Sequence, residues 1–388
     1  MKTDPPLETL FPPLGGDVLP LLEGLPALID RVFPLPRRFR SGLPQDVAEL
    51  SRFLTGGRED RDSGYLGRPA LLSAYLRYFL PWNVYRLCRL LPALPLSLAA
   101  GNALTDLGSG PLTLPVALWL SRPDLRGLSL EFRCLDRNGA ALEAGKALFS
   151  TLAGKDCPWV IKTIRAPLGA PVHGPRAALV TAVNVYNEIP EGGAPGVFAD
   201  KQVRLLSALA GEGGAILVVE PGIPRSGEFI AALRGALEAQ GRFPLAPCPH
   251  GGPCPLPGGF TPGGRGKAKW CHFAFTTADA PRDLQTLSVA AGFPKERAVL
   301  SFLLAGPRTG KPPAHPGSPL LVRIISDSFP LPRSGEYGRY GCSAKGLVLV
   351  AGTREKTEPP EPGTLLRLRS PPREQRDPKS KALIFPLD

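Results

Sequence analysis

The stretch Ala103–Leu112, ALTDLGSGPL, decides the fold of this chain. An apolar run reaches Asp106, two glycines follow at Gly108 and Gly110, and Pro111 opens the next apolar segment. Glycine permits positive φ and close approach of a ligand to the backbone. Proline suits the first position of a helix, whose N-terminus offers free N–H groups. The stretch therefore predicts a strand, a tight turn and a helix that together face a ligand.

Residues 101–240 alternate between β-like and helical runs. The expected strands are Asn102–Leu107, Leu128–Leu135, Trp159–Ile164, Ala177–Val183 and Ala215–Val219. The expected helices are Leu114–Leu120, Ala140–Leu152, Lys201–Ala210 and Glu228–Gln240. This alternation is typical of βαβ units, so we expect an α/β fold with a doubly wound, Rossmann-like sheet.

The rest of the chain divides into three further regions. Residues 1–95 predict a helical region, with helices at Ala70–Phe79 and Trp82–Leu91 separated by Pro81. The Rossmann-like domain is expected over 96–240, and a Cys-rich insertion with the remaining strands of the sheet over 241–350. Those strands are Trp270–Thr276, Arg297–Ala305, Leu320–Ile325 and Gly346–Val350. Residues 351–388 read as a basic, proline-rich tail.

Composition limits the partner and the compartment. The formal charge of +12 favours a polyanionic partner, although a genome rich in Arg, Gly, Pro and Ala codons would produce the same excess. Seven scattered cysteines indicate a reducing compartment rather than a disulfide scaffold. The N-terminus has neither a signal peptide's apolar core nor a transit peptide's character, and no apolar run is long enough to cross a membrane. We therefore expect a soluble, cytoplasmic monomer.

The turn after the first strand resembles the first motif of S-adenosylmethionine-dependent methyltransferases. It departs from that motif at Leu112, where a third glycine often stands. A carboxylate directly after the second strand can accept both ribose hydroxyls, and Asn184–Glu188 follows a buried strand at the edge where open α/β sheets bind ligands. The expected S-adenosylmethionine-binding residues are Asp106, Gly108, Ser109, Gly110, Asp136 and Asn184. A capping or turn role is an equal alternative for Asn187, and no catalytic residue is identified.

A second pattern is CPHGGPCP, in which Cys248 and Cys254 flank His250, followed by WCHF with Cys271 and His272. Thiolates in this pattern predict a metal centre, either an iron–sulfur cluster or zinc with a histidine ligand. The five-residue gap is wider than zinc sites usually have, and unrelated free cysteines are a third possibility. Nearby cations are expected to offset the thiolate charge, namely Arg242, Arg265, Lys267 and Lys269. The cysteines expected to be ordinary core residues are Cys88, Cys134 and Cys157.

Taken in order, these motifs resemble one family. In chain order, the motifs that carry the resemblance are DLGSGP, LDRN, NVYNE, VVEPG, APCPHGGPCP and WCHF. Through them the chain is similar to the methyltransferase-like proteins associated with the mitochondrial small ribosomal subunit and their bacterial homologues. The resemblance implies an assembly factor that engages small-subunit RNA and carries a four-cysteine [4Fe–4S] cluster. Carried over by motif, its ligands are Cys248, Cys254, Cys271 and Cys342.

Three hypotheses about function follow. The first is a small-subunit assembly or translation factor in which the cluster is structural and clips Gly241–His272 to the region around Cys342. The second is an active S-adenosylmethionine-dependent rRNA methyltransferase. A radical enzyme is disfavoured, because four thiolates leave no iron open to substrate. Basic residues in the tail are expected to contact RNA phosphates, or else to form a solvated surface: Arg367, Arg369, Arg373, Arg376, Lys379 and Lys381.

Overall fold

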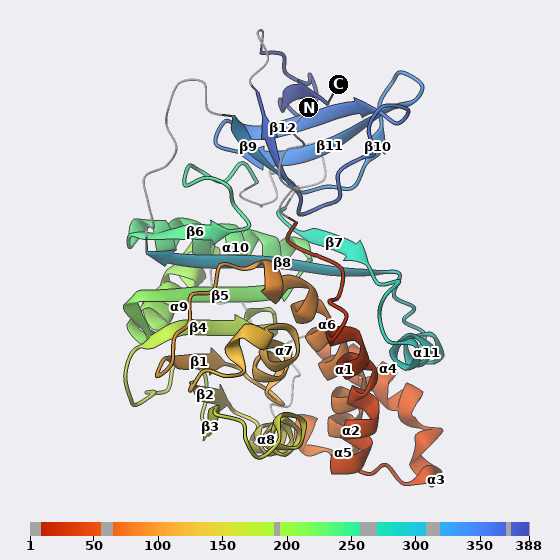
Figure 1. The fold of residues 1–388 in the computed structure, drawn as a ribbon, viewed down its shortest axis with the longest axis vertical. Helices are drawn as coiled ribbons and strands as arrows, with labels where there is room; N and C mark the ends of the chain where they lie inside the picture. The colour runs from red at the N-terminus through yellow and green to blue at the C-terminus, as the bar shows by residue number, and fades with distance from the viewer. Residues whose placement is uncertain are drawn as a thin grey trace.

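The computed structural model describes residues 9–55, 65–189, 195–256, 270–307, 319–369 and 374–387. Its main body is built on an eight-stranded sheet with the order β3-β2-β1-β4-β5-β8-β6, and β7 pairs with β8 (Figure 1). The strands are β1 Ala103–Leu107, β2 Glu131–Asp136, β3 Val160–Arg165, β4 Ala177–Val183, β5 Ala210–Pro221, β6 Arg242–Ala246, β7 Phe273–Thr276 and β8 Arg297–Pro307. The first five strands pair in parallel, and β8 is antiparallel to β5, β6 and β7. The doubly wound, Rossmann-like sheet expected from the sequence is confirmed.

Helices cover both faces of this sheet because alternate strand residues point to opposite sides. Leu217 and Val219 of β5 belong to the core shared with α7 (Thr113–Ser121) and α8 (Gly139–Ala153). Ile216 and Val218 belong to the core shared with α9 (Pro195–Leu209) and α10 (Pro224–Ala239). The sheet thus lies between two apolar layers, as its buried strands predicted.

The N-terminal helices add to the layer of α7. They are α1 Val18–Glu23, α2 Leu25–Val32, α3 Arg37–Arg40, α4 Leu43–Thr55, α5 Pro69–Ala74 and α6 Leu80–Leu90. A π-helical turn, η2 (Tyr75–Phe79), joins α5 directly to α6. Helical residues therefore continue through Pro81, whereas the sequence predicted two separate helices. Pro81 is tolerated because it lies in the first turn of α6, where its missing N–H costs little.

A second, six-stranded sheet lies above the main body in Figure 1. Its order is β13-β9-β11-β12-β14, with β10 paired to β11. The strands are β9 Leu320–Ile324, β10 Phe329–Pro330, β11 Glu336–Ser343, β12 Gly346–Thr353, β13 Leu365–Leu368 and β14 Leu383–Pro386. The sheet buries its own small core, made of Val322, Ile324, Val348, Val350, Leu366, Leu383 and Phe385.

This second sheet corrects two expectations. The runs at 320–325 and 346–350 were expected to complete the main sheet, but β9 and β12 pair with β11 instead. Residues 351–388 were expected to form a tail, but β13 and β14 are the two outer strands of the second sheet. Each is only four residues long, so prolines around it hid the alternation that marks a strand.

The Cys-rich insertion was expected to begin at residue 241 and its first strand only at Trp270, but the segment begins with β6. Pro244 obscured this strand, since proline cannot donate to a ladder and argues against a central strand. In the structure β6 is an outer strand paired only with β8 among the described residues, which is where a proline is tolerated. In the described part of the chain, no helix has the length and apolar character to cross a bilayer.

Candidate functional site

The turn after β1 brings the chain across the carboxyl edge of the sheet. Gly108 and Gly110 have φ values of +65° and +51°, which glycine adopts without strain. A Cβ on Gly108 would lie 2.5 Å from Val185 Cγ2, so only glycine lets the turn approach the segment after β4 this closely. Leu112, which replaces the expected third glycine, also has a left-handed φ of 57° and is fully buried in the core.

Asp106 holds this turn from inside the sheet. Its carboxylate accepts hydrogen bonds from Ser109 Oγ at 2.7 Å and Thr181 Oγ1 at 2.6 Å. Asp106 and Ser109 are 2% and 3% exposed, and neither is among the described residues that line the neighbouring pocket. Burial raises the pKa of Asp106 to about 6, against the lowering effect of the two hydroxyls. The structure therefore places Asp106 as a brace for the turn, and its direct contact with a cofactor stays a prediction.

Asp136, by contrast, faces the pocket from the end of β2. Its Oδ2 accepts from the Gly110 N–H at 2.8 Å, and its Oδ1 accepts from the Asn138 N–H at 2.8 Å. A carboxylate has about four lone-pair directions, so two bonds leave it able to accept hydroxyl groups. Asp136 thus fixes the turn and presents acceptors to the pocket.

Asn184 follows β4 on the other side of the pocket. Its φ of 55° is left-handed, which asparagine tolerates better than most residues, and its N–H donates to the Val219 carbonyl at 2.8 Å. The next turn, η5 (Tyr186–Glu188), is held by the buried Glu220 at the end of β5, which accepts from the N–H groups of Val185, Tyr186 and Asn187 at 2.8 to 3.0 Å. Burial raises the pKa of Glu220 to about 8, although these three donors favour its charged form.

Asn187 stabilises the turn, which was one of the two roles considered for it from the sequence. With its amide nitrogen facing the turn, it donates to the Asn184 carbonyl and to Glu220 Oε2, both at 3.0 Å.

Together these segments form a pocket of about 570 Å³ at the carboxyl ends of the parallel strands. Of the predicted residues, Gly108, Gly110, Asp136 and Asn184 line it. Its location fits the rule that open α/β sheets bind ligands where the strand order reverses, here between β1 and β4. Lining residues that sequence reasoning missed include Tyr75, Arg137, Glu188, Phe198, Lys201 and Gln202.

Tyr75 reaches the pocket from the N-terminal region, for which the sequence predicted only helices. A Cβ on Gly110 would lie 3.9 Å from its hydroxyl, so the two residues face each other across the turn. Asn83 hydrogen-bonds the Tyr75 hydroxyl and also accepts from the half-buried Arg86. Helical periodicity gives no signal for this contact, because it depends on how α5 and α6 pack on the main body.

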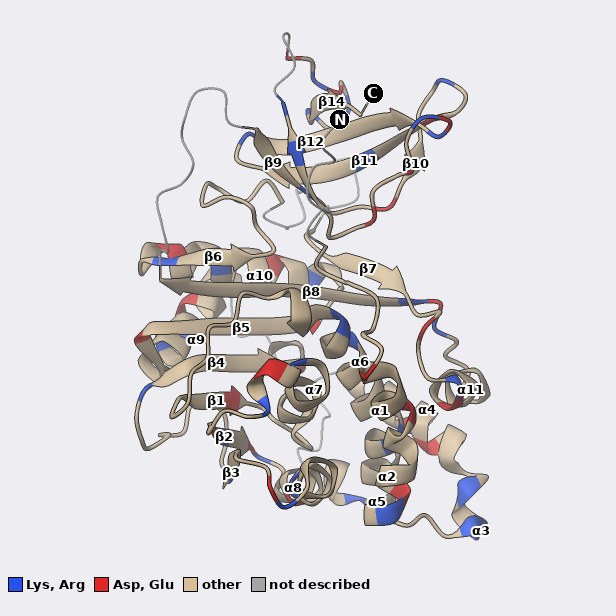
Figure 2. Cartoon of the chain, viewed as in Figure 1, with Lys and Arg blue, Asp and Glu red and all other residues tan. Residues whose placement is uncertain are grey.

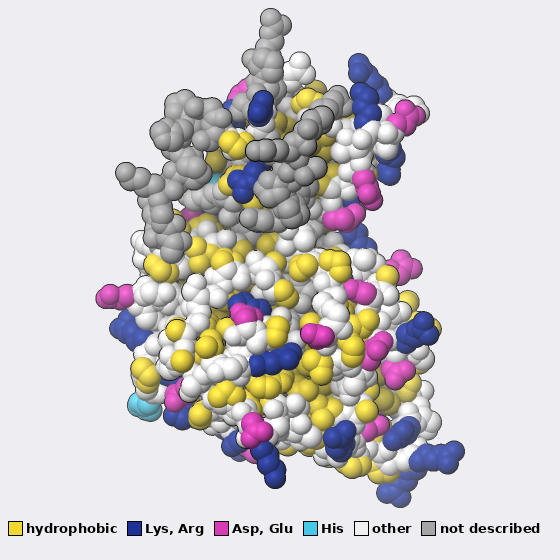
Figure 3. Space-filling model, viewed as in Figure 1, with side chains coloured by type: hydrophobic (Ala, Val, Ile, Leu, Met, Phe, Trp, Pro, Cys, Tyr) yellow, Lys and Arg dark blue, Asp and Glu magenta, His cyan; other side chains and the backbone are white. Residues whose placement is uncertain are grey.

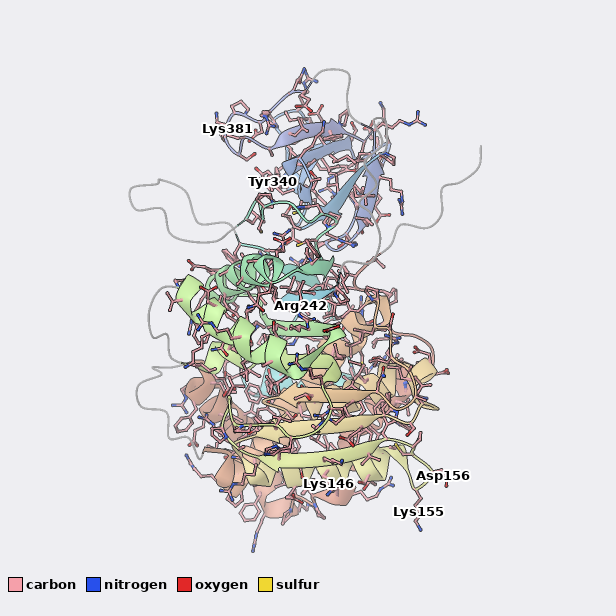
Figure 4. All side chains as sticks on the ribbon, turned by 90° about the vertical axis from the view of Figure 1, so that its left-hand side faces the viewer. Lys146, Lys155, Asp156, Arg242, Tyr340 and Lys381 are labelled. Atoms are coloured by element: carbon pink, nitrogen blue, oxygen red, sulfur yellow. The ribbon has the colours of Figure 1, made fainter. Side chains whose placement is uncertain are left out.

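The four predicted metal ligands meet at the junction of the two sheets. Cys248 and Cys254 lie in the loop after β6, Cys271 directly precedes β7, and Cys342 lies in β11 of the second sheet. Figure 4 shows this junction from the side, with Arg242 of β6 below it and Tyr340 of β11 above it. Each thiol lies near the other three, because every pair among them interacts electrostatically. The fold therefore brings Cys342 close to the other three cysteines, although it lies 71 positions after Cys271 in the sequence.

The surroundings of the four thiols favour their neutral form. Burial raises the pKa of all four thiols, that of Cys248 to about 11, and neighbouring thiols raise those of Cys248, Cys271 and Cys342 further. Arg242, expected to offset thiolate charge, instead donates to the carbonyls of Gly214 and Gly211 at 2.5 and 2.9 Å. Arg265, Lys267 and Lys269 lie outside the described residues. In the described ranges, no group of three or more His, Cys, Asp or Glu side chains is arranged to hold a metal ion.

The cation at the junction is Arg234 of α10, which sequence reasoning missed. It is buried, hydrogen-bonds the Cys248 sulfur, and lowers the pKa of all four thiols. It also donates to the carbonyls of His250 and Gly252 at 3.2 and 2.6 Å and to Glu238 Oε2 at 3.0 Å. An arginine in mid-helix carries no motif, so only the packing of α10 under the loop reveals it.

The two histidines of the region have different surroundings. His250 Nε2 lies 3.2 Å from the Cys342 sulfur. His272 stacks on Trp270, and its Nδ1 lies 3.2 Å from the Trp270 carbonyl. Cys88 and Cys134 are buried in the core, as expected, and Cys157 packs against it.

The comparison with protein families confirms the resemblance seen in the sequence. The model of the family described as mitochondrial small ribosomal subunit Rsm22 matches residues 169–326. That range runs from before β4 to the end of β9 and contains Cys248, Cys254 and Cys271, but neither the turn after β1 nor Cys342. No curated protein matches the chain.

Solved structures similar to the chain include several methyltransferases. A putative methyltransferase from Thermoplasma acidophilum is 12% identical, covers 55% of this chain and 71% of its own, and has a TM-score of 0.33. An S-adenosylmethionine-dependent methyltransferase from Thiobacillus denitrificans, in complex with S-adenosyl-L-homocysteine, is 13% identical over 59% and 92% of the two chains, with a TM-score of 0.34. The YcgJ protein of Bacillus subtilis is 10% identical over 58% and 100%, with a TM-score of 0.35. Scores this low leave the fold assignment to the strand order itself.

The raised pKa of Asp106 predicts how its substitution changes the pH dependence of stability. The folded state holds this proton up to about pH 6 and the unfolded state releases it near pH 3.8, the ordinary pKa of aspartate, so stability is lost as pH rises between these values. From pH 4 to pH 7, the free energy of unfolding of the wild type should fall by about 3 kcal/mol more than that of Asp106→Asn, since each pKa unit is worth about 1.4 kcal/mol. Urea unfolding measures the difference, and parallel curves for the two proteins would contradict it.

Proposed function

We propose that this protein is an assembly or translation factor of the small ribosomal subunit. In this proposal it binds rRNA, holds S-adenosylmethionine in the pocket of its methyltransferase-like domain, and binds a [4Fe–4S] cluster with four cysteines. The observation that carries the proposal is that Cys248, Cys254, Cys271 and Cys342 lie near one another at one junction, with Cys342 buried and the other three half-buried. The matched family's description supplies the link to the small ribosomal subunit. That description names the mitochondrial small ribosomal subunit, so the cytoplasmic location stays a prediction. The monomeric state stays a prediction as well.

The chemistry of the four thiols fits an iron–sulfur cluster. A tetrahedral zinc site needs four ligands within about 2.3 Å of one point. The described side chains are not gathered in such a single-ion geometry. A cluster of four irons and four sulfides occupies the space between its cysteines, so its ligands stand further apart. Four cysteines are the usual ligand set of a [4Fe–4S] cluster, so we propose the cluster ahead of the zinc alternative.

A cluster at this junction would act structurally. Three of its ligands belong to loops of the main body and the fourth belongs to the second sheet. Protein contacts already connect the two parts, for instance Arg323 of β9, whose Nε donates to the Pro247 carbonyl at 3.1 Å next to Cys248. Four metal–thiolate bonds would fix the orientation of the second sheet, and with it the cations on that sheet.

The pocket residues suit S-adenosylmethionine by position and polarity. The Asp136 carboxylate can accept the ribose hydroxyls, while Gly108, Gly110 and Asn184 leave the backbone open to the ligand. When bound, this cofactor supplies an activated methyl group. The open pocket is also the feature that favours the alternative, an active rRNA methyltransferase.

The basic groups proposed to contact RNA lie at two edges of the second sheet. Arg367 and Arg369 are exposed at β13, whereas Lys379 and Lys381 are exposed beside β14, at the opposite end of the strand order. Arg376 is exposed near β14 and donates to the Lys381 carbonyl, and Arg373 lies outside the described residues. Figures 2 and 3 show Lys and Arg dispersed over the visible face, including the second sheet and α3 at the other end of the molecule. We therefore treat the two edges as separate RNA contacts.

Metal analysis tests the proposal most directly. Anaerobically purified protein should be brown and hold about four irons per chain, as a [4Fe–4S] centre requires. Cys248→Ser and Cys342→Ser should each bleach it, because each removes a ligand. Cys88→Ser is the matched control and should keep the iron, since Cys88 is buried elsewhere in the core. Colourless wild-type protein with about one zinc per chain would overturn the cluster.

Calorimetry tests the cofactor pocket. Wild-type protein should bind S-adenosylmethionine, and Gly110→Val should bind none at millimolar ligand, because a β-branched residue is strained at a φ of +51° and projects toward Tyr75. Gly101→Val is the matched control: Gly101 has a φ of +82° but precedes β1 at the other end of the strand. Equal affinity of the Gly110 variant and the wild type would contradict the site. Transfer of a labelled methyl group to small-subunit RNA would establish the enzymatic alternative.

Salt titrations test the RNA contacts. The logarithm of affinity falls with the logarithm of salt concentration by about 0.7 to 0.9 per neutralised phosphate. The double variants Arg367→Ala/Arg369→Ala and Lys379→Ala/Lys381→Ala should each weaken binding of small-subunit RNA and reduce that slope by about 1.4 to 1.8. Arg37→Ala/Arg38→Ala, at the exposed helix α3, is the charge-matched control and should leave the slope unchanged. Equal slopes in all four proteins would show that both edges are solvated surface.

A further inference from the structure

The ring of His250 is held between two partners at the cysteine junction. Its Nε2 lies 3.2 Å from the Cys342 sulfur, and its Nδ1 accepts a hydrogen bond from the Gly252 N–H at 3.2 Å. Arg234 fixes the same loop by donating to the carbonyls of His250 and Gly252. The backbone and a buried side chain thus set the direction in which the ring points.

The contact with Gly252 decides where the ring carries its proton. A backbone N–H can only donate, so the Nδ1 that faces it must be without hydrogen. A neutral imidazole carries one N–H, which is therefore on Nε2 and points at the Cys342 sulfur. To bind a metal through Nε2, the ring would have to move its proton to Nδ1, where it would oppose the Gly252 N–H.

We propose that His250 is not a metal ligand but donates a hydrogen bond to the Cys342 sulfur, and that this bond tunes the metal centre. The inference rests on the proposed four-cysteine centre and assigns the role of a residue next to it. Hydrogen bonds to ligating sulfur withdraw negative charge, so they favour the reduced form of a cluster and help to retain the metal. His250 is in this sense a positioning residue for Cys342.

The test compares four variants of the full chain after anaerobic purification. His250→Ala removes the donor, and His250→Gln can return an amide N–H to the same place. Cys342→Ser removes a ligand, and His272→Ala is the matched control, because the His272 ring lies against Trp270. Three quantities are measured: iron and zinc per chain, the midpoint reduction potential, and the rate of metal loss to a chelator.

His250→Ala should keep the wild-type metal content, shift the potential to a more negative value and lose metal to the chelator faster, because removing an outer-shell partner usually weakens metal affinity about 10- to 100-fold. His250→Gln should restore part of both properties, and His272→Ala should match the wild type. Loss of metal from His250→Ala to the same extent as from Cys342→Ser would make His250 a ligand and overturn the inference. Unchanged potential and unchanged release would overturn it as well.

The same measurements separate this inference from the proposed function. If the wild-type protein holds zinc, the iron–sulfur proposal fails, but the role of His250 is still tested by the zinc content and the rate of zinc release. If His250→Ala then retains its zinc but releases it to the chelator faster than the wild type, the hydrogen bond is supported. Loss of the zinc from this variant, or release at the wild-type rate, refutes it.

Discussion

The structure depends on how one buried guanidinium, that of Arg234, is satisfied. A charged group inside a protein is costly unless hydrogen bonds and countercharges surround it. Arg234 obtains Glu238 from its own helix and the carbonyls of His250 and Gly252 from the loop above. The loop that carries Cys248 and Cys254 is therefore bound to α10, and these two cysteines are brought toward Cys342 by contacts that the protein makes itself.

The turns beside the pocket are likewise held by buried side chains, in this case carboxylates. Asp106 is satisfied by two hydroxyls and Glu220 by three backbone N–H groups, and each fixes one of the turns that flank the pocket. Burial raises the pKa of both acids, so these turns are held at a cost in stability at neutral pH. Asp136, half-buried at the rim, is the acid that can both fix the turn and face a ligand.

The sequence predicted the features that local patterns encode. Alternating apolar runs gave the parallel strands from β1 to β5 and helices α7 to α10, and the Gly108–Gly110 turn gave the pocket's position. It missed β6, β10, β13 and β14, because short strands containing or adjoining proline show no clear alternation. It also missed the central strand β11, whose sequence EYGRYGCS mixes glycine and polar residues with few apolar ones. It also missed Arg234 and Tyr75, whose roles arise from packing between segments distant in the chain. Asp106 was identified as important from its motif, but only its burial shows that it braces the turn.

The position of Cys342 explains why a chain would join a Rossmann-like body to a second sheet through cysteines. Cys342 lies in the middle of the second sheet, on β11, where it pairs with Leu347 of β12 and Arg323 of β9. A metal ligand on a central strand would fix the orientation of the whole sheet, whereas a metal ligand on a loop would fix only that loop. Since β13 and β14 carry exposed cations at the two ends of the strand order, fixing β11 fixes both sets at once. The proposed metal centre and the proposed RNA contacts would in this way be coupled by one sheet, without any of the basic residues having to touch the metal.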